Sequence, residues 1–411
     1  MTSFALAARM QQIKPSPTFA AAARVKALLA EGRDIIDLTL GEPDFDTPDH
    51  IKAAAIDAIN RGETKYTPVD GTMALKKAIC EKFRTENGLE YKPEEISVGT
   101  GGKQVIYNAL TVTIQEGDEV IIPAPYWVSY PDIVLLAGAK PVLVPLSIDS
   151  GFKITAEMVR AAITPRTKWF IINSPSNPCG AAYTRAELQA LADELKRHPQ
   201  VMILSDDLYE HVVYDDFEFT NIAMLDAELK TRTLVVNGVS KAYAMTGWRM
   251  GYSAGPKWLI DAMRNLQSQV TSNPCSISQA ATVAALSGDQ TIVHERTAEF
   301  KKRRDATAAG LQKIPGVKCH VPEGAFYLFP SVENFIGMCT PDGKQLANDV
   351  DVTMYLLDSV GVAVVMGSAF GLAGFIRISY AASVEKLQDA CARMGRAFGA
   401  LKSAQNGKCA A

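Results

Sequence analysis

The sequence predicts an α/β protein with a large domain built on an open, doubly wound, mostly parallel sheet and a smaller α+β domain. Between about residues 95 and 255, short runs rich in Val and Ile alternate with segments of helical periodicity. These runs are apolar on both faces, which is typical of strands that lie beneath helices on each side of a sheet. Such alternation indicates crossover connections between neighbouring strands.

The large domain is expected to contain seven strands and the helices between them. The clearest helix is Thr184–Arg197, because Thr184 and Glu187 have the spacing of a capping box ahead of an amphipathic pattern. Pro256–Ser287 is predicted as one long helical connection. The strands are predicted at Ile96–Val98, Glu119–Pro123, Pro141–Pro145, Trp169–Asn173, Val201–Leu204, Leu234–Asn237 and Gly251–Ala254.

The smaller domain is predicted from short strands and a C-terminal helix. We place the large domain at residues 46–290, and the small domain at residues 1–45 together with residues 291–411. The last residues, 403–411, are expected to be disordered. The helix should follow Ser383, and the strands are expected at Gly324–Phe329, Val362–Val365 and Phe375–Tyr380.

Length and composition restrict the function classes. A chain of 411 residues is too long for one compact core, and 47% hydrophobic with 21% charged residues is ordinary for a soluble enzyme. A net charge of −3 provides no basic surface for nucleic acid or an anionic membrane. No apolar stretch is long enough to span a bilayer, and Met1–Met10 does not resemble a signal peptide, so a cytoplasmic protein is expected.

The seven cysteines and five histidines are scattered along the chain without paired spacing. We interpret the odd number of cysteines as reduced thiols rather than a disulfide framework. Neither residue type shows the spacing of a metal site, so the sequence predicts no bound metal.

The most informative segment is the turn that follows the strand Leu234–Asn237. It carries Ser240 and Lys241, and Arg249 follows eight residues after the lysine. Ligands bind beyond the carboxyl ends of strands in such sheets, where a desolvated lysine becomes a nucleophile and an arginine can hold a phosphate. An amine beside a phosphate anchor favours a carbonyl cofactor that carries a phosphate, and pyridoxal 5′-phosphate (PLP) fits best. Taken alone, Lys241 would be interpreted as a solvated surface charge.

Two neighbouring strand ends supply the polar groups that a pyridoxal ring needs. Asn177 follows one predicted strand, and Asp206 and Tyr209 follow the next. A carboxylate keeps a pyridine nitrogen protonated, and an amide and a phenol can donate hydrogen bonds to the phenolate oxygen O3′. Singly, Asn177 is equally consistent with an Asn-Pro turn and Asp206 with a helix cap. Together with Lys241 they favour a cofactor site.

A glycine-rich loop, Gly99–Lys103, precedes a predicted helix at Gln104–Val112. The backbone N–H groups of Gly101, Gly102 and Lys103 at a helix N-terminus form a phosphate cradle. The loop lacks the third glycine of a dinucleotide fingerprint and the Lys-Ser/Thr pair of a Walker A loop, which excludes both motifs.

Two further residues are consistent with ligand binding or with ordinary structural roles. Trp127 can stack on a cofactor ring, although a tryptophan is more often part of a core. Arg377 lies between two isoleucines in the strand Phe375–Tyr380, where a charge needs a partner. A substrate carboxylate is one such partner, but the strand pattern alone favours a salt bridge or an exposed face.

Together these residues resemble the fold-type I, class I PLP-dependent aminotransferases, and the resemblance covers nearly the whole chain. More narrowly, the chain is similar to the bacterial aspartate aminotransferases of the subgroup that includes aspartate/prephenate aminotransferases. The motifs that carry the resemblance are Gly41–Pro48, Lys65–Pro68, Pro125–Tyr130, Asn177–Gly180, Asp206 with Tyr209, Ser240–Arg249 and Arg377.

The resemblance implies roles for the matching residues around the cofactor ring. Lys241 would bond covalently to the cofactor and then move a proton between the substrate Cα and cofactor C4′. Asp206 would pair with the pyridine nitrogen, while its neighbour Asp207 points to the opposite face. Asn177 and Tyr209 would bind O3′.

The resemblance also implies a phosphate site, a substrate site and a second subunit. Tyr66 would reach the phosphate of the neighbouring subunit, so a homodimer is expected. The phosphate would lie among Gly101, Gly102, Lys103, Ser240 and Arg249. The amino-acid substrate would contact Gly41, Trp127, Asn177 and Arg377, with Trp127 stacking on the ring as well.

Acidic substrates are implied in the same way. No motif matches the second arginine that binds the distal carboxylate in animal-type aspartate enzymes, but Lys14 and Lys103 match the lysines that do so in the bacterial subgroup. Aspartate, glutamate, 2-oxoglutarate and oxaloacetate are therefore expected in a ping-pong transamination, with prephenate as a further acceptor. Two alternatives stay open, an aromatic- or alanine-preferring PLP transaminase and a non-catalytic ligand-binding protein on the same fold.

Overall fold

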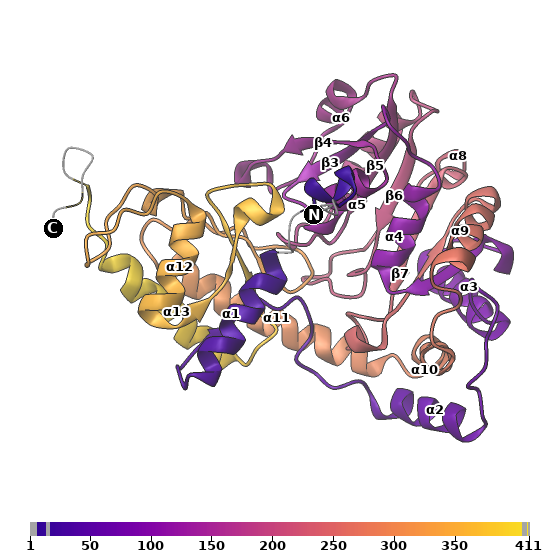
Figure 1. The fold of residues 1–411 in the computed structure, drawn as a ribbon, viewed down its shortest axis with the longest axis horizontal. Coiled ribbons are helices and arrows are strands. Elements are labelled where there is room, and N and C mark those ends of the chain that lie inside the picture. Colours follow the sequence, from indigo (N-terminus) through magenta and orange to yellow (C-terminus); the bar gives the residue numbers. More distant parts are fainter. Residues whose placement is uncertain (1–5, 14–16, 405–408, 410–411) are drawn as a thin grey trace, which may run out of the picture.

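The computed structural model describes residues 6–13, 17–404 and 409, and its larger part is built on a seven-stranded sheet (Figure 1). The strand order is β2-β8-β7-β6-β5-β3-β4. Neighbouring strands are parallel from β4 across to β7, whereas β8 is antiparallel to both β7 and β2. The predicted strands are confirmed, with small shifts at their ends, as β2 (Ile96–Thr100), β3 (Glu119–Ala124), β4 (Lys140–Pro145), β5 (Thr167–Asn173), β6 (Met202–Asp206), β7 (Thr233–Gly238) and β8 (Met250–Ala254).

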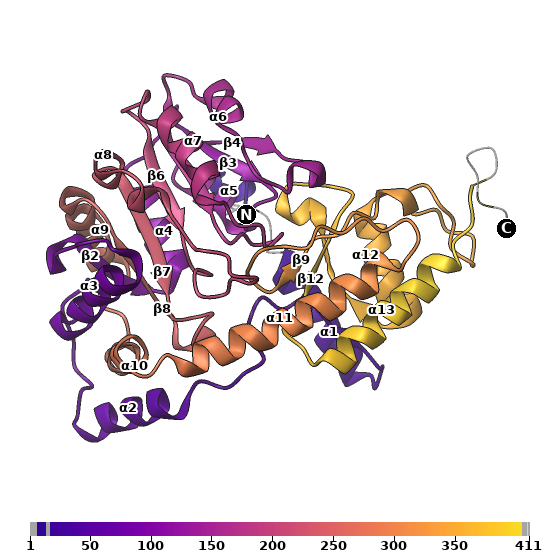
Figure 2. The same cartoon turned by 180° about the vertical axis from the view of Figure 1, so that it is seen from behind.

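Helices cover both faces of this sheet, and further helices with short strands build the remainder of the molecule (Figures 1 and 2). Within the described residues, no helix is long and apolar enough to cross a bilayer. The helices are α1 (Pro17–Ala30), α2 (Asp49–Asn60), α3 (Met73–Asn87), α4 (Gly102–Thr111), α5 (Ser129–Leu136), α6 (Ala156–Ala162), α7 (Arg185–Leu195), α8 (Ala227–Lys230), α9 (Lys257–Val270), α10 (Ser276–Ser287), α11 (Thr291–Gln312), α12 (Asp349–Val360) and α13 (Val384–Gly399).

The strands are apolar throughout because successive side chains enter cores on opposite faces of the sheet. In β5, Trp169 and Ile171 pack in a core shared with α4 and α9. Phe170 and Ile172 pack on the other face, in a core shared with α6 and α7. The doubly wound arrangement expected from the Val- and Ile-rich runs is therefore confirmed.

One predicted helix is confirmed and another prediction is wrong. Thr184 caps α7, and its side chain and that of Glu187 form the expected capping box. The single helical connection predicted over Pro256–Ser287 is instead two helices, α9 and α10, separated by residues 271–275. Pro274 lies in this break, where its ring lacks an N–H group and cannot continue a helix.

The smaller part of the molecule combines the C-terminal region with residues near the N-terminus. β9 (Tyr327–Leu328), β11 (Val365–Met366) and β12 (Ile376–Ser379) form an antiparallel sheet in the order β11-β12-β9. β1 (Ile36–Asp37) pairs in parallel with β10 (Val362–Ala363). One core joins β1, β9, β10 and β12 to α11, α12 and α13, whereas β11 packs in a neighbouring core with Phe329 and Phe370. Figure 2 shows α11 running from beside α10 to α12 and α13.

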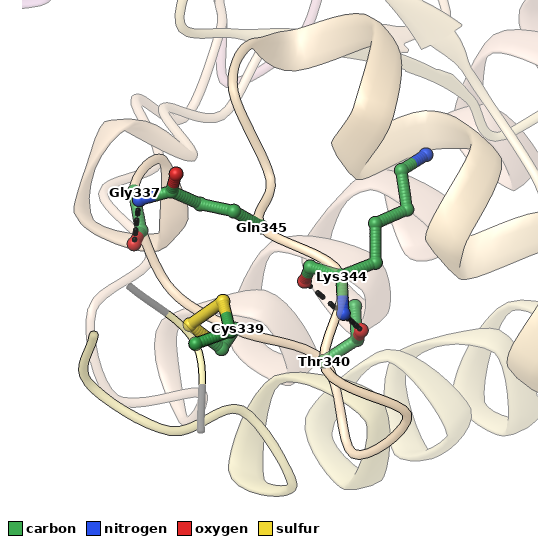
Figure 3. Close-up of a disulfide and its surroundings, with 6 residues drawn as sticks. Gly337, Cys339, Thr340, Lys344 and Gln345 are labelled. Atoms are coloured by element: carbon green, nitrogen blue, oxygen red, sulfur yellow. Dashed lines mark hydrogen bonds between the residues drawn. A yellow bond between two sulfur atoms is a disulfide. The ribbon is translucent and has the colours of Figure 1, made fainter. Parts of the chain in front are cut away.

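A disulfide between Cys339 and Cys409 ties the C-terminal segment to this smaller part (Figure 3). The expectation that all cysteines are reduced is therefore wrong for this pair. The backbone of Cys339 exchanges hydrogen bonds of 2.8 and 2.9 Å with that of Lys402, which brings together segments far apart in the sequence. Spacing along the chain could not reveal this, since 70 residues separate the two cysteines. Within the tail that was expected to be disordered, residues 405–408 and 410–411 lie outside the described residues.

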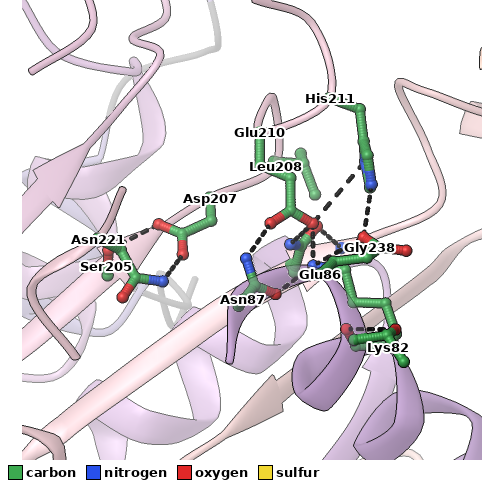
Figure 4. Close-up of polar contacts among 12 residues, drawn as sticks. Lys82, Glu86, Asn87, Ser205, Asp207, Leu208, Glu210, His211, Asn221 and Gly238 are labelled. Atoms are coloured by element: carbon green, nitrogen blue, oxygen red, sulfur yellow. Dashed lines mark hydrogen bonds and ion pairs between the residues drawn. The ribbon is translucent and has the colours of Figure 1, made fainter. Parts of the chain in front are cut away.

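A buried ion pair joins α3 to the segment that follows β6 and to β7 itself (Figure 4). Lys82, on α3, is fully buried and pairs with Glu210, which lies just beyond β6. Asn87 accepts a hydrogen bond from Lys82 at 2.7 Å and donates one to Glu210 at 3.0 Å. Asn237, on β7, donates to the other oxygen of Glu210 at 2.7 Å. One buried carboxylate therefore connects three elements of the large sheet region.

Glu210 also lies close to Glu86 and His211, in a group whose atoms are near enough to share a cation. The Lys82 ammonium already pairs with Glu210 and lies 3.5 Å from Glu86, so it supplies the positive charge that these carboxylates need. Burial alone would raise the pKa of Glu210, but Lys82 and then His211 outweigh it and lower the pKa to about 2. The geometry is that of an internal ion-pair network.

Replacing Lys82 by Met should lower the free energy of unfolding by about 3–5 kcal/mol near neutral pH, because Glu210 is left buried without its cation. The depressed pKa of Glu210 stabilises the native state above the ordinary glutamate pKa, and this stability is lost as the pH falls toward about 2. The difference in the free energy of unfolding between the variant and the wild type should therefore decrease as the pH falls from the ordinary glutamate pKa toward about 2. Urea unfolding at several pH values measures both effects.

The control is Lys257→Met, which breaks an exposed ion pair with Asp261 and should leave the unfolding midpoint nearly unchanged. An effect at Lys82 no larger than that of the control would contradict the structural role of the buried pair.

Candidate active site

A cavity of about 560 Å³ lies where β5, β6 and β7 end, between the sheet and the smaller part of the molecule. Parallel strands end at the same edge of a sheet, so the polar residues that follow them meet there. Lys14 lies outside the described residues, and Gly101 and Tyr66 do not line the cavity. The other predicted site residues do line it, namely Gly41, Gly102, Lys103, Trp127, Asn177, Asp206, Tyr209, Ser240, Lys241, Arg249 and Arg377.

Lys241 reaches the cavity from the turn after β7. Its Nζ donates a hydrogen bond to the carbonyl oxygen of Gly41 at 2.5 Å. Burial and then the charge of Arg377 lower the pKa of Lys241 to about 8, while Glu42 acts in the opposite direction. At neutral pH more of this amine is therefore neutral, and so nucleophilic, than of an ordinary lysine.

Asp206 is the last residue of β6 and is buried beside the cavity. Its Oδ2 accepts a hydrogen bond from the hydroxyl of Tyr130 at 2.5 Å. Burial raises the pKa of Asp206 above its ordinary value, and the Tyr130 hydroxyl opposes this shift. The neighbouring Asp207 does not line the cavity, since its carboxylate accepts hydrogen bonds of 2.6 Å from Ser205 and Asn221 (Figure 4). The side chains of the successive residues Asp206 and Asp207 thus point to opposite faces of the sheet.

Tyr209 and Asn177 lie at the cavity with part of their hydrogen-bonding capacity already used. The hydroxyl of Tyr209 is 2.7 Å from that of Tyr327, which comes from β9. The side-chain oxygen of Asn177 accepts a hydrogen bond from Arg377 at 3.1 Å, and its backbone N–H donates to Asn173 at 2.8 Å. The side-chain NH₂ of Asn177 is the group that can still donate to a ligand.

The glycine-rich loop and Arg249 form another wall of the site. Gly101 precedes α4 with φ of +82°, and a Cβ there would lie 2.6 Å from the guanidinium of Arg249. A Cβ on Gly251, in β8, would overlap the backbone of Gly102. Arg249 donates a hydrogen bond to the carbonyl oxygen of Thr246 at 2.9 Å. This close backbone packing leaves the first N–H groups of α4 as anion donors beside Ser240 and Lys103.

Lys103 lies next to Trp127, with its Nζ 5.0 Å from the centre of the indole ring. Burial and then the charge of Arg249 lower the pKa of Lys103. Trp127 also contacts the ring of Tyr130 edge to face, with ring centres 5.3 Å apart. The indole is thus packed against Tyr130 and still lines the cavity.

Arg377, on β12, is only 2% exposed. It donates hydrogen bonds to Asn177 at 3.1 Å and to the carbonyl oxygen of Thr39 at 2.5 Å, while its Nε is buried with no partner in the described part of the chain. Its guanidinium carbon lies 4.7 Å and 4.9 Å from the ring centres of Tyr327 and Phe370. The two alternatives that the strand pattern favoured do not fit. The face is not exposed, and no carboxylate of the described residues pairs with the guanidinium.

Tyr66 lies apart from the cavity of its own chain and is 91% exposed. It lines a second hollow of about 430 Å³, together with residues that include Arg61 and Ser276. Within the described part of one chain, Tyr66 therefore does not reach the glycine-rich loop and Arg249, where the phosphate is expected.

Sequence reasoning missed several residues of the cavity. Tyr130 and Glu42 lie inside motifs that the sequence singled out, but their partners are distant in sequence and only the fold assigns them. Thr246 donates a hydrogen bond to Glu42 at 2.7 Å. Tyr327, which contacts Tyr209 and Arg377 beside the cavity without lining it, had no distinguishing pattern, since it lies in a short apolar strand.

The residues present fit a PLP group. The cavity provides a lysine amine of lowered pKa, a buried carboxylate, hydrogen-bond donors and a glycine-rich anion wall, each on a different element. Its lining contains four cationic side chains and two carboxylates, Glu42 and Asp206. This excess of positive charge suits a phosphate together with an acidic substrate. The cationic residues are Lys103, Lys241, Arg249 and Arg377.

Comparison with known proteins is consistent with this site. The family model for aminotransferase class I and II matches residues 33–394. An aspartate/prephenate aminotransferase of Cereibacter sphaeroides is 58% identical over 385 residues, covering 94% of this chain and 96% of that protein. An aspartate aminotransferase of Rhizobium meliloti is 55% identical over 394 residues, covering 96% of each.

Solved structures show the same fold. The crystal structure of the Rhizobium meliloti aspartate aminotransferase has a TM-score of 0.94 at 55% identity, and the match covers 97% of this chain and 100% of that one. The aspartate aminotransferase of Thermus thermophilus with maleate has a TM-score of 0.89 at 42% identity, covering 96% and 100%. The fold-type I architecture expected from the sequence is thereby confirmed. The chain belongs to the aminotransferase class I and II family, and is a PLP-dependent transferase.

Proposed function

We propose that this protein transfers the amino group between L-aspartate and 2-oxoglutarate, forming oxaloacetate and L-glutamate, and that it also converts prephenate to L-arogenate. The observation that carries the proposal is the burial of Arg377 in the cavity of Lys241 without a carboxylate partner among the described residues. A guanidinium in that position is completed by the carboxylate of an amino-acid substrate. The names of the two relatives compared above support aspartate and prephenate as substrates.

The side chains of the cavity divide the chemistry between them. When bound, PLP supplies an electron sink that stabilises negative charge on the substrate Cα. With PLP bound, the Lys241 amine would be placed to accept the proton of the substrate Cα and to donate it again at cofactor C4′, as general base and then general acid. Asp206 keeps the pyridine nitrogen protonated, and Asn177 and Tyr209 donate hydrogen bonds to O3′.

The remaining groups hold the phosphate and the substrate. Trp127 stacks on the cofactor ring and, with Gly41, contacts the substrate. Arg377 binds the substrate α-carboxylate, and Lys103 and Lys14 attract its distal carboxylate. Maleate, bound by the Thermus thermophilus relative, is a dicarboxylate and supports this preference. The phosphate is held by Gly101, Gly102, Lys103, Ser240 and Arg249.

A homodimer is part of this proposal, because the exposure of Tyr66 suits a residue that completes the phosphate site of a second subunit. We also propose that residues 46–290 form the cofactor domain and that residues 1–45 with 291–411 form the domain that closes on the substrate. The shared core of β1, β10 and the C-terminal helices supports that division. A cytoplasmic location and a role in amino-acid biosynthesis complete the proposal.

Half-reaction spectroscopy tests the function directly. The PLP-loaded protein should lose the absorbance of its Lys241-linked cofactor when mixed with aspartate, glutamate or arogenate.

Lys241→Ala should reduce turnover by about 10³-fold or more, since both the covalent link and the proton carrier are removed. Lys257→Ala, a lysine on the exposed side of α9, is the matched control. A faster reaction with aromatic amino acids or alanine than with aspartate would favour the alternative transaminase, and no reaction with any amino acid would favour a binding protein.

The lowered pKa of Lys241 predicts an unusual pH dependence in the apo-protein. Modification of Lys241 by an amine-directed reagent should increase as the pH rises and level off above about 8, because only the neutral amine reacts. Modification of Lys52, whose pKa is raised by its hydrogen bond to Asp49, should keep increasing well beyond that pH. Peptide mass spectrometry at a series of pH values measures both residues in one sample, and equal profiles would contradict the effect of burial.

Replacing Lys14 by Ala should weaken acceptors with a distal carboxylate more than neutral ones. The expected change is about a tenfold higher KM for 2-oxoglutarate and prephenate, with phenylpyruvate little affected, because a charge-assisted contact is lost. Lys26→Ala, on α1, is the control for loss of one positive charge at another position of the chain. Equal losses for all acceptors would count against a role of Lys14 in selecting dicarboxylates.

A further inference from the structure

Tyr130 places its hydroxyl directly against the carboxylate of Asp206. Tyr130 is the second residue of α5 and is fully buried. Its O–H donates to Oδ2 of Asp206 at 2.5 Å, which is in the short range typical of a hydroxyl bound to an ionised carboxylate. The other oxygen, Oδ1, lies 3.4 Å from the backbone N–H of Leu208, a long contact. One oxygen of Asp206 is thus strongly engaged, and the other is left for a ligand.

The placement of Tyr130 is itself well defined. Its backbone N–H donates to the carbonyl oxygen of Trp127 at 3.0 Å, and the two rings meet edge to face with centres 5.3 Å apart. The residue therefore spans from the indole that lines the cavity to the carboxylate at the end of β6. Neither contact needs a ligand to be formed.

We infer that Tyr130 is a positioning residue for the cofactor, and that its hydroxyl holds Asp206 as a carboxylate whose Oδ1 is directed to the pyridine nitrogen. This inference rests on the proposed role of Asp206.

The physical basis is the competition of two bases for one proton. A hydrogen bond to Oδ2 stabilises the charged form of Asp206, so the proton shared between Oδ1 and the pyridine nitrogen stays on the nitrogen. Without the hydroxyl, Asp206 becomes the stronger base, and that single proton moves toward its Oδ1. A neutral pyridine withdraws fewer electrons, which weakens the electron sink that the reaction needs.

The other groups around Asp206 are few in the described structure. Lys241 approaches from the turn after β7, and Tyr209 and Asp207 belong to the same segment as Asp206. Asn173, on β5, donates to the backbone carbonyl oxygen of Asp206 at 2.8 Å and leaves the carboxylate to Tyr130. Burial raises the pKa of Asp206, and the contribution of Tyr130 is the largest of those that oppose it.

The test uses the PLP-loaded Tyr130→Phe enzyme and two readouts other than turnover. The midpoint of the pH titration of the Lys241-linked cofactor's absorbance should move to higher pH by about one unit, because a neutral ring makes the Lys241 nitrogen more basic. Release of the cofactor should become about tenfold faster, since the anchoring carboxylate has lost its hydroxyl donor. A midpoint and a release rate equal to those of the wild type would overturn the inference.

The matched control is Tyr183→Phe. Tyr183 is buried to a similar degree, accepts a hydrogen bond from the backbone N–H of Ile154 at 2.9 Å and lies outside the cavity. This variant should keep the wild-type midpoint and release rate. The same shift in both variants would reflect a general loss of packing and would overturn the inference.

Asp206→Asn separates this inference from the proposed function. Tyr130→Phe should add nothing to the midpoint shift in an Asp206→Asn background, because the hydroxyl acts only through that carboxylate. If Asp206→Asn itself leaves the midpoint unchanged, the proposed role of Asp206 fails and the inference fails with it. If Asp206→Asn shifts the midpoint but Tyr130→Phe does not, only the inference about Tyr130 fails.

A ring-fluorinated tyrosine at position 130 gives a test that keeps the packing intact, including the case in which the Phe variant folds poorly. Its more acidic hydroxyl is a stronger donor, so the midpoint should move to lower pH, opposite to the Phe variant. A shift to higher pH, or none, would overturn the inference.

Discussion

Burial of positive charge without a matching carboxylate is the constraint on which this site depends. Arg377 cannot lose its proton, so it stays charged in a cavity where few groups neutralise it. Lys241 responds differently, because burial and the nearby guanidinium lower its pKa to about 8. Burial, reinforced by repulsion from Arg377, therefore makes the lysine a nucleophile, and the buried positive charge makes the cavity attractive to anions.

Contacts outside the cavity hold the strand ends near these charges in fixed positions relative to each other. Glu210 follows Tyr209 directly and is tied by Lys82 to α3 and by Asn237 to β7, the strand that leads to Lys241. A buried ion pair is costly to break once one partner is removed, so it resists movement of these two strand ends relative to each other. The ion pair of Lys82 and Glu210 therefore acts on the positions of the strand ends and not on the ligand directly, since neither residue lines the cavity.

Periodicity along the chain was sufficient to predict the architecture of the large sheet. Strands buried on both faces are distinguished by composition, and all seven were predicted close to their observed ends. Two errors had different origins. Pro274, a local helix breaker that hydrophobic periodicity does not register, divides the predicted connection into α9 and α10. The disulfide of Cys339 with Cys409 depends on pairing between segments that lie far apart in the sequence.

Residue types and their positions at strand ends were also sufficient to gather Lys241, Asp206 and Asn177 at one place, because parallel strands share an edge. They could not show the surroundings of Arg377, for which the strand pattern favoured a surface or a salt bridge. Nor could they reveal the partner of Asp206, since Tyr130 lies 76 positions away in the chain. Which groups are desolvated, and which of them meet, follows from packing between distant segments. Such packing sets the ionisation of each group, and a linear pattern of side chains does not contain it.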